Sequence, residues 1–137
     1  MNRVLDFWFN TLKPADWYEK SDELDARIKT LFEQTYHQIV AGETSHWRDV
    51  SDGKLAEIIV LDQFTRNMFR GTPESFNSDP LALALAQEAV RCGTDQDLEG
   101  TKRSFLYMPF MHSESRVVHE QAIELFKDLS RVSSGYV

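Results

Sequence analysis

The sequence predicts an all-α domain of about five to six antiparallel helices, packed as a bundle or superhelix. Apolar residues recur at helical spacing through nearly the whole chain, and residues typical of helix starts and stops separate the segments. No alternating apolar and polar run is flanked by hairpin turns, so no sheet is predicted. We expect residues 1–129 to form a single domain and the polar residues 130–137 to form a frayed tail.

The N-terminal segment predicts a short helix followed by a long one. Large apolar residues lie at i, i+3, i+4 and i+7 of the first helix, namely Leu5, Trp8, Phe9 and Leu12. Pro14 ends this helix. Ser21 is a good N-cap for the second helix because its hydroxyl can accept a hydrogen bond from a free backbone N–H group. The second helix ends at Gly42, a residue type common just after helix C-termini.

The third helix is expected to be central and buried. It starts after the turn at residues 51–53, and it runs to about Phe69 before Gly71 and Pro73. Apolar residues surround this helix almost completely, which is typical of a helix buried on all sides.

Three further helices are predicted in the C-terminal half. Asp79 before Pro80 is typical of an N-cap followed by a proline at the first helical position, and the helix that they open stops at Gly93. A short helix runs through residue 106 and is broken at Pro109. The last helix is capped by one of the serines that follow. The candidate N-caps of these last two helices are Asp95 or Thr101, and Ser113 or Ser115.

Composition and charge bound the class of protein. The 137 residues include 15 Lys and Arg against 22 Asp and Glu, a formal net charge of −7. An acidic chain is a poor general binder of phosphate backbones, so no nucleic-acid partner is expected. No apolar run approaches the roughly 20 residues that cross a bilayer, and no export signal is present, so we expect a cytoplasmic protein without a membrane partner. The single Cys92 excludes an internal disulfide.

A polar strip interrupts the apolar surface of the central helix. Asp62 and Arg66 are i, i+4 neighbours, and so are Gln63 and Asn67. Burying these side chains is costly unless each is paired, so the strip faces polar partners or a wet cavity. In a structural interpretation, an internal ion pair and an amide bridge fix the helix packing. In a functional one, Asp62 orients Arg66 as a planar donor to an anion or a carbonyl group.

A second polar group lies at residues 109–115, at the turn before the last helix. Its backbone N–H groups are expected to be free, and Glu114 suits a helix N-terminus because its charge opposes the helix dipole. This role is purely structural. The alternative makes His112 a general acid or base, with Glu114 or Asp62 setting its tautomer.

No motif indicates a metal ion or an organic cofactor. Candidate metal ligands lie close in sequence, but the paired cysteines of zinc deaminases are absent and no His-Glu-x-x-His occurs. The chain has neither the glycine loop of a P-loop nor a Gly-x-Ser-x-Gly elbow. We therefore expect no metal and no cofactor. The side chains considered as metal ligands are His112, Glu114, His119 and Glu120.

Four motifs, in this order, resemble the bacterial domain-of-unknown-function 924 family. They are LDFWF at residues 5–9, GE at 42–43 followed by Trp47, LDQFTRNMFRGT at 61–72, and FLYMPFMHSE at 105–114. The resemblance extends from about residue 4 to residue 129. It implies a fold similar to that of tetratricopeptide-repeat proteins, a superhelix of stacked helix pairs. It implies no assigned biochemical function.

The sequence departs from this family in two ways. Thr65 stands where the family usually has proline, so the central helix is expected to bend less. Family members also usually continue into a further helix beyond residue 137. The resemblance thus implies an incomplete pocket and an apolar groove, which a second copy could cover in a homodimer.

Three functions stay open at this point. In the first, the domain binds a small anionic ligand or a peptide terminus in a polar pocket. In the second, an enzyme of hydrolase or lyase type uses His112 and Glu114 as catalytic residues and Arg66 to polarise the substrate. This hypothesis requires His112 to approach the strip of Asp62 and Arg66 in space. In the third, the domain is purely structural or binds other proteins. The ligand-binding residues of the first hypothesis are Asp62, Gln63, Arg66 and Asn67, with Trp8 and Phe110 as walls. Arg66, Arg70, Lys102 and Arg103 are expected to form a local basic patch that attracts small anions.

Overall fold

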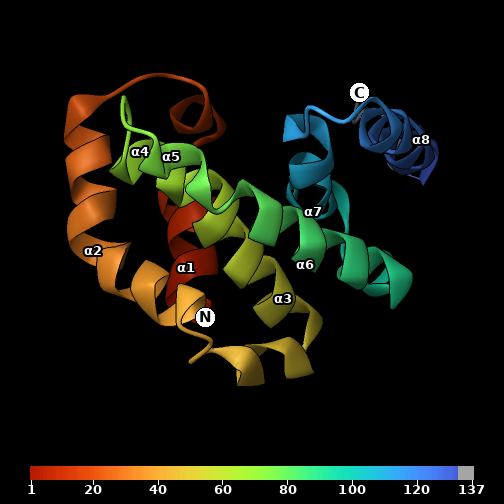
Figure 1. Cartoon of the computed structure of the whole chain (residues 1–137), viewed down its shortest axis with the longest axis horizontal. Helices are drawn as coiled ribbons and strands as arrows, with labels where there is room; N and C mark the ends of the chain where they lie inside the picture. The colour runs from red at the N-terminus through yellow and green to blue at the C-terminus, as the bar shows by residue number, and fades with distance from the viewer. Residues whose placement is uncertain (133–137) are drawn as a thin grey trace.

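The computed structural model of the chain describes residues 1–132, and this part of the chain is helical with no strand. When helical segments that continue directly into one another are counted as one helix, the described residues form six long helices. Figure 1 shows α2 (Asp22–Val40) and α8 (Arg116–Val132) at opposite edges, with α6 (Asp79–Arg91) crossing between them. The predicted all-α class is confirmed.

The N-terminal helices begin and end close to the predicted residues. α1 (Asn2–Leu5) continues directly into a π-helical segment, η1 (Asp6–Thr11), and the 3₁₀ turn η2 (Pro14–Trp17) follows. The Ser21 hydroxyl accepts a hydrogen bond from the Leu24 backbone N–H at 3.1 Å, as expected for an N-cap. α2 ends before Gly42, whose φ of 79° is left-handed.

The central helix is continuous from Ser51 to Met68. It comprises α3 (Ser51–Ile58), the π-helical segment η4 (Ile59–Phe64) and α4 (Thr65–Met68). The predicted start after residue 53 is wrong, because residues 51–53 form the first helical turn. The predicted burial is present, since every residue from Leu55 to Asp62 is buried.

Gly53 allows a close crossing beneath the central helix. The 3₁₀ segment η3 (Ser45–Asp49) passes against the start of α3, and a Cβ atom on Gly53 would lie 1.7 Å from the Trp47 carbonyl oxygen. The buried carboxylate of Glu57 then holds this segment in place. It accepts hydrogen bonds from the Thr44 hydroxyl at 2.7 Å and from Arg48 Nε at 2.7 Å.

Two backbone carbonyl groups in the π-helical segment η4 accept hydrogen bonds from side chains. In a π-helix the backbone hydrogen bonds span five residues instead of four, so the turn is wider than in an α-helix. The Thr65 hydroxyl donates to the Leu61 carbonyl at 2.8 Å, and the Arg66 guanidinium donates to the Asp62 carbonyl. Thr65 and Arg66 therefore add side-chain hydrogen bonds to the wide turn.

Two predicted helix boundaries in the C-terminal half are wrong. α6 begins at Asp79 itself, with Ser78 in the cap position, and the Asp79 carboxylate binds a distant arginine instead of capping the helix. α7 (Gly100–His112) is not broken at Pro109. Proline removes one backbone donor, and here it does so within the last turn of the helix and inside the core, where packing holds the chain helical.

Shorter segments complete the second half of the chain. α5 (Glu74–Asn77) precedes α6, and the 3₁₀ turn η5 (Thr94–Asp97) follows it. Ser115 is the cap of α8, since its hydroxyl accepts a hydrogen bond from the Val118 N–H at 3.3 Å. α8 extends to Val132, so residues 130–132 are helical, contrary to the predicted tail. Residues 133–137 of that tail lie outside the described residues.

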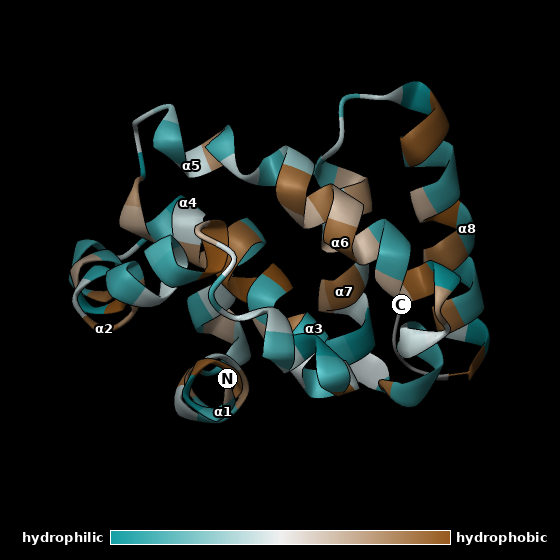
Figure 2. Ribbon diagram, turned by 60° about the horizontal axis from the view of Figure 1, so that its bottom comes forward, coloured by the Kyte–Doolittle hydropathy of each residue, from teal (hydrophilic) through white to brown (hydrophobic). Residues whose placement is uncertain are grey.

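An aromatic cluster joins the N-terminal helix to the central helix and α7. The Trp8 ring lies 5.6 Å from the Phe64 ring and 5.6 Å from the Phe105 ring, and it stacks on Trp17. Figure 2 shows hydrophobic and hydrophilic residues alternating along α8, as expected for a helix with one buried face. Within residues 1–132, no helix combines the length and the apolarity that crossing a membrane requires.

We predict that Gly53→Ala destabilises the protein by about 1–3 kcal/mol, because the new methyl group overlaps the Trp47 carbonyl and overpacks the crossing. Helix propensity alone gives the opposite sign, a gain of roughly 0.5–1 kcal/mol for this change inside a helix. Urea unfolding followed by circular dichroism measures the difference. An unchanged or higher free energy of unfolding would show that η3 does not press on α3 in this way.

Candidate functional site

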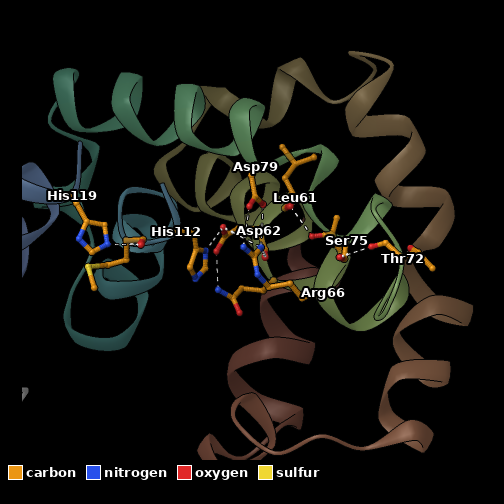
Figure 3. A network of polar contacts seen from close by, with 11 residues as sticks. Leu61, Asp62, Arg66, Thr72, Ser75, Asp79, His112 and His119 are labelled. Atoms are coloured by element: carbon orange, nitrogen blue, oxygen red, sulfur yellow. Dashed lines mark hydrogen bonds and ion pairs between the residues drawn. The ribbon is translucent and has the colours of Figure 1, made fainter. Parts of the chain in front are cut away.

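The two longest motifs of the sequence meet in space. His112 is the last residue of α7, and not part of a turn as predicted, and Asp62 lies in η4 of the central helix. His112 Nδ1 lies 2.7 Å from Asp62 Oδ1. Figure 3 shows the Asp62 carboxylate between the His112 ring and Arg66. The convergence that the enzyme hypothesis requires is therefore present.

The Asp62 carboxylate is buried and accepts hydrogen bonds on both oxygens. The residue is 1% exposed. Gln63 Nε2 donates to Oδ2 at 2.8 Å, and Arg66 Nη1 lies 3.5 Å from Oδ1. Because a carboxylate can only accept, His112 Nδ1 carries the proton of their hydrogen bond. In the neutral ring, Nε2 then has a free lone pair.

Arg66 is held by a second carboxylate, which the sequence analysis missed as a site residue. Asp79 accepts two parallel hydrogen bonds from Arg66, at 3.2 Å from Nη1 and 3.0 Å from Nη2. The guanidinium carbon also lies 5.3 Å from the centre of the Phe76 ring. No local signal marks Asp79, because a helix start and an ion pair both favour an acidic residue.

A cleft of about 740 Å³ opens in front of His112, and we call it the histidine cleft. The His112 side chain is 27% exposed there, whereas Asp62 lies behind it in the interior. One part of the lining is polar and the other apolar. The lining residues are Arg66, Phe76, Asp79, Pro80, Leu83, Pro109, His112, Ser113, Glu114 and Ser115.

The predicted amide bridge between Gln63 and Asn67 is not formed. Gln63 donates to Asp62, whereas Asn67 Nδ2 donates to Asp25 of α2 at 2.9 Å. Arg70 also binds Asp25, through Nε at 2.7 Å. Asn67 therefore belongs to a contact between α4 and α2 and does not line the histidine cleft.

The predicted walls Trp8 and Phe110 lie elsewhere. Trp8 is 2% exposed in the aromatic cluster of the core. Phe110 lines a separate groove between α6 and α8, with Val90 and Leu125. Two residues along a helix correspond to about 200°, so Phe110 points away from the face of α7 that carries His112. The apolar part of the histidine cleft is instead lined by Phe76, Leu83 and two prolines.

The other predicted clusters separate in space. His119 Nε2 donates to the Met111 carbonyl at 2.8 Å, and Glu120 pairs with Arg116. Glu114 lines the histidine cleft, but Asp62 is the carboxylate that binds the His112 ring. Among residues 1–132, no group of three metal-binding side chains is close enough to hold an ion.

The predicted basic patch of Arg66, Arg70, Lys102 and Arg103 does not form as one group, because Lys102 and Arg103 are bound to other side chains. Lys102 pairs with Asp52 at 3.7 Å. Arg103 is buried, and its Nε donates to the Tyr107 hydroxyl at 2.8 Å, while that hydroxyl donates to Asp95 at 2.6 Å. Burial, together with the hydrogen bond to Asp95, raises the pKa of the Tyr107 phenol.

Comparison with known proteins identifies relatives without an assigned activity. The family described as "Bacterial protein of unknown function (DUF924)" matches residues 4–136. A solved structure of a protein of unknown function from Agrobacterium tumefaciens is 34% identical, with a TM-score of 0.88. The match covers 93% of this chain and 72% of that chain. No protein of curated function matches the chain.

We predict that Asp62→Ala lowers the free energy of unfolding by about 1–3 kcal/mol, because it leaves the partly buried donors of His112, Arg66 and Gln63 without their shared carboxylate. Asp128→Ala is the matched control. It removes an exposed carboxylate paired with Arg131, and it should cost less than about 1 kcal/mol. Equal losses in urea unfolding would contradict the role given to Asp62.

A second prediction concerns Tyr107 at alkaline pH. Its pKa is raised on folding, so above the ordinary value of about 10 the unfolded state loses a proton that the folded state retains. The stability contributed by this group is therefore lost as pH rises. Between about pH 9 and 11, Tyr107→Phe should show a smaller loss of stability than the wild type. Tyr18→Phe, at an exposed tyrosine, should follow the wild type in urea unfolding.

Proposed function

The chain belongs to the bacterial DUF924 family of proteins of unknown function, and we propose from the geometry of the histidine cleft that it is a proton-transfer enzyme of hydrolase type. One observation carries this proposal. A buried carboxylate lies 2.7 Å from Nδ1 of a partly exposed histidine, and the same ring lines a cleft. General bases of hydrolytic enzymes combine these features, namely a fixed tautomer and access to a substrate.

In the proposed reaction, His112 Nε2 accepts a proton from a water molecule. The water oxygen attacks the carbonyl carbon of the substrate, and the bond to the leaving group breaks. Nε2 then returns the proton to the leaving group, so the imidazole ends as it began. Asp62 is a positioning residue, because it orients the ring and its charge stabilises the imidazolium formed between the two steps. A lyase would use the same base on a C–H bond.

Charge in the histidine cleft favours a neutral reacting group over an anion. Asp79 and Glu114 line this cleft together with the cationic side chain of Arg66. The two amino groups of Arg66 are already bound to Asp79. A carboxylate placed here would compete with Asp79 for Arg66 and would lie near Glu114, which costs energy. An ester or amide carbonyl fits this environment better.

The main alternative is that the hydrogen bond between Asp62 and His112 is purely structural and only holds the central helix against α7. The deep burial of Asp62 favours it, since buried charges are also found where they only fix packing. The two hypotheses differ in one respect. A structural role needs only His112 Nδ1, whereas a catalytic role also needs Nε2 to accept a proton.

We predict that the protein hydrolyses 4-nitrophenyl acetate and that His112→Gln lowers kcat/KM by about 100-fold or more, the usual contribution of a positioned acid or base. His119→Gln is the control, because its ring N–H is already bound to the Met111 carbonyl and it should retain the wild-type rate. Release of 4-nitrophenolate measures the reaction. Equal rates for the wild type and His112→Gln would reject the hydrolase proposal.

A further inference from the structure

A second cleft lies on the other side of Arg66. It has a volume of about 690 Å³, and Arg66 and Phe76 line both this cleft and the histidine cleft. Its remaining lining comes from the turn after the central helix, with Arg70, Thr72 and Ser75. We call it the arginine cleft. A molecule that passes Arg66 and Phe76 would therefore contact both clefts at once.

We propose that the arginine cleft binds the anionic end of the substrate while its scissile bond lies beside His112. This inference rests on the proposed function, because it assigns the substrate class of the same site. The substrate is then a small ester or amide that carries a carboxylate or phosphate group a few bonds from the reacting carbonyl.

The charges of the two clefts are opposite in kind. Among residues 1–132, the lining of the histidine cleft has two carboxylates, whereas that of the arginine cleft has two guanidinium groups and no acidic residue. The carboxylates that pair with these arginines, Asp79 and Asp25, do not line the arginine cleft. The lining of the arginine cleft thus contains the guanidinium groups of both ion pairs but neither of these carboxylates, so an anion that enters it meets hydrogen-bond donors.

Arg70 retains donors for such a ligand. Its Nε and Nη2 bind Asp25 at 2.7 and 3.2 Å, so Nη1 is available on the same planar group. The two hydrogen bonds that Arg70 donates to this one carboxylate also fix the plane of the guanidinium before a ligand arrives. Phe76 is 60% exposed beside it and offers an apolar surface to the carbon chain of the substrate.

The test compares two esters that differ in one charge. Mono-4-nitrophenyl succinate carries a free carboxylate, and 4-nitrophenyl acetate does not. We expect the wild type to prefer the succinate ester by about tenfold in kcat/KM, the effect of one charged hydrogen bond. Arg70→Gln should abolish this preference. Asp25→Asn, which removes the competing carboxylate but retains an acceptor for Arg70, should increase it.

Opposite effects of Arg70→Gln and Asp25→Asn on the preference for the succinate ester separate an effect of charge from an effect of stability. A damaged fold would lower this preference in both variants. Arg91→Gln is the matched control, since it removes the same charge from an exposed arginine on α6. Calorimetric titration with succinate measures the arginine cleft without any reaction, and we expect Arg70→Gln to weaken binding about tenfold.

The outcomes distinguish the two proposals. A preference for the anionic ester that Arg70→Gln leaves unchanged overturns this inference, while hydrolysis that depends on His112 still supports the hydrolase. Succinate binding that depends on Arg70, with no hydrolysis that depends on His112, overturns the hydrolase and supports the anion site. Succinate binding of equal strength in the wild type and Arg70→Gln overturns the anion site.

Discussion

The buried carboxylate of Asp62 is the interaction on which the candidate site depends. A negative charge at 1% exposure is tolerated only where donors surround it. His112 supplies one donor from α7, and Gln63 and Arg66 supply others from the central helix. Because these donors come from two helices, pairing this one charge also orients the imidazole ring and holds the end of α7 against the central helix.

The π-helical segment of the central helix places this carboxylate among its donors. In a regular α-helix, backbone N–H groups would bond to the carbonyl groups of Leu61 and Asp62. At the wide turn, the side chains of Thr65 and Arg66 also donate to these carbonyls. Arg66 is thereby drawn back along its own helix and reaches Asp79 of α6 at the same time. A local irregularity of the helix thus creates a polar junction between three helices.

Arg66 and its stacked neighbour Phe76 divide the surface beside this junction into two clefts. The ion pair between Arg66 and Asp79 has its carboxylate in one cleft and shares its guanidinium with the other. The arrangement of ion pairs therefore gives the two neighbouring clefts different charged side chains in their linings, although the molecule as a whole carries a formal charge of −7. The net charge determines that the surface repels anionic polymers, whereas the local ion pairs decide which small molecules each cleft can bind.

The sequence by itself determined the long helices, the Ser21 and Ser115 caps and the polar strip, because spacing and capping depend on neighbours a few residues apart. Ser21 and Gly42 delimit α2 for such local reasons. Helix start at Asp79 and the continuation of α7 through Pro109 were not predictable locally, since a distant arginine and core packing decide them. The sequence also placed both Asp62 and His112 in motifs, but fifty residues separate them. Only the tertiary structure decided that they touch, and that Trp8 and Phe110 do not line the cleft, because the rotation of each packed helix selects which side chains face one another.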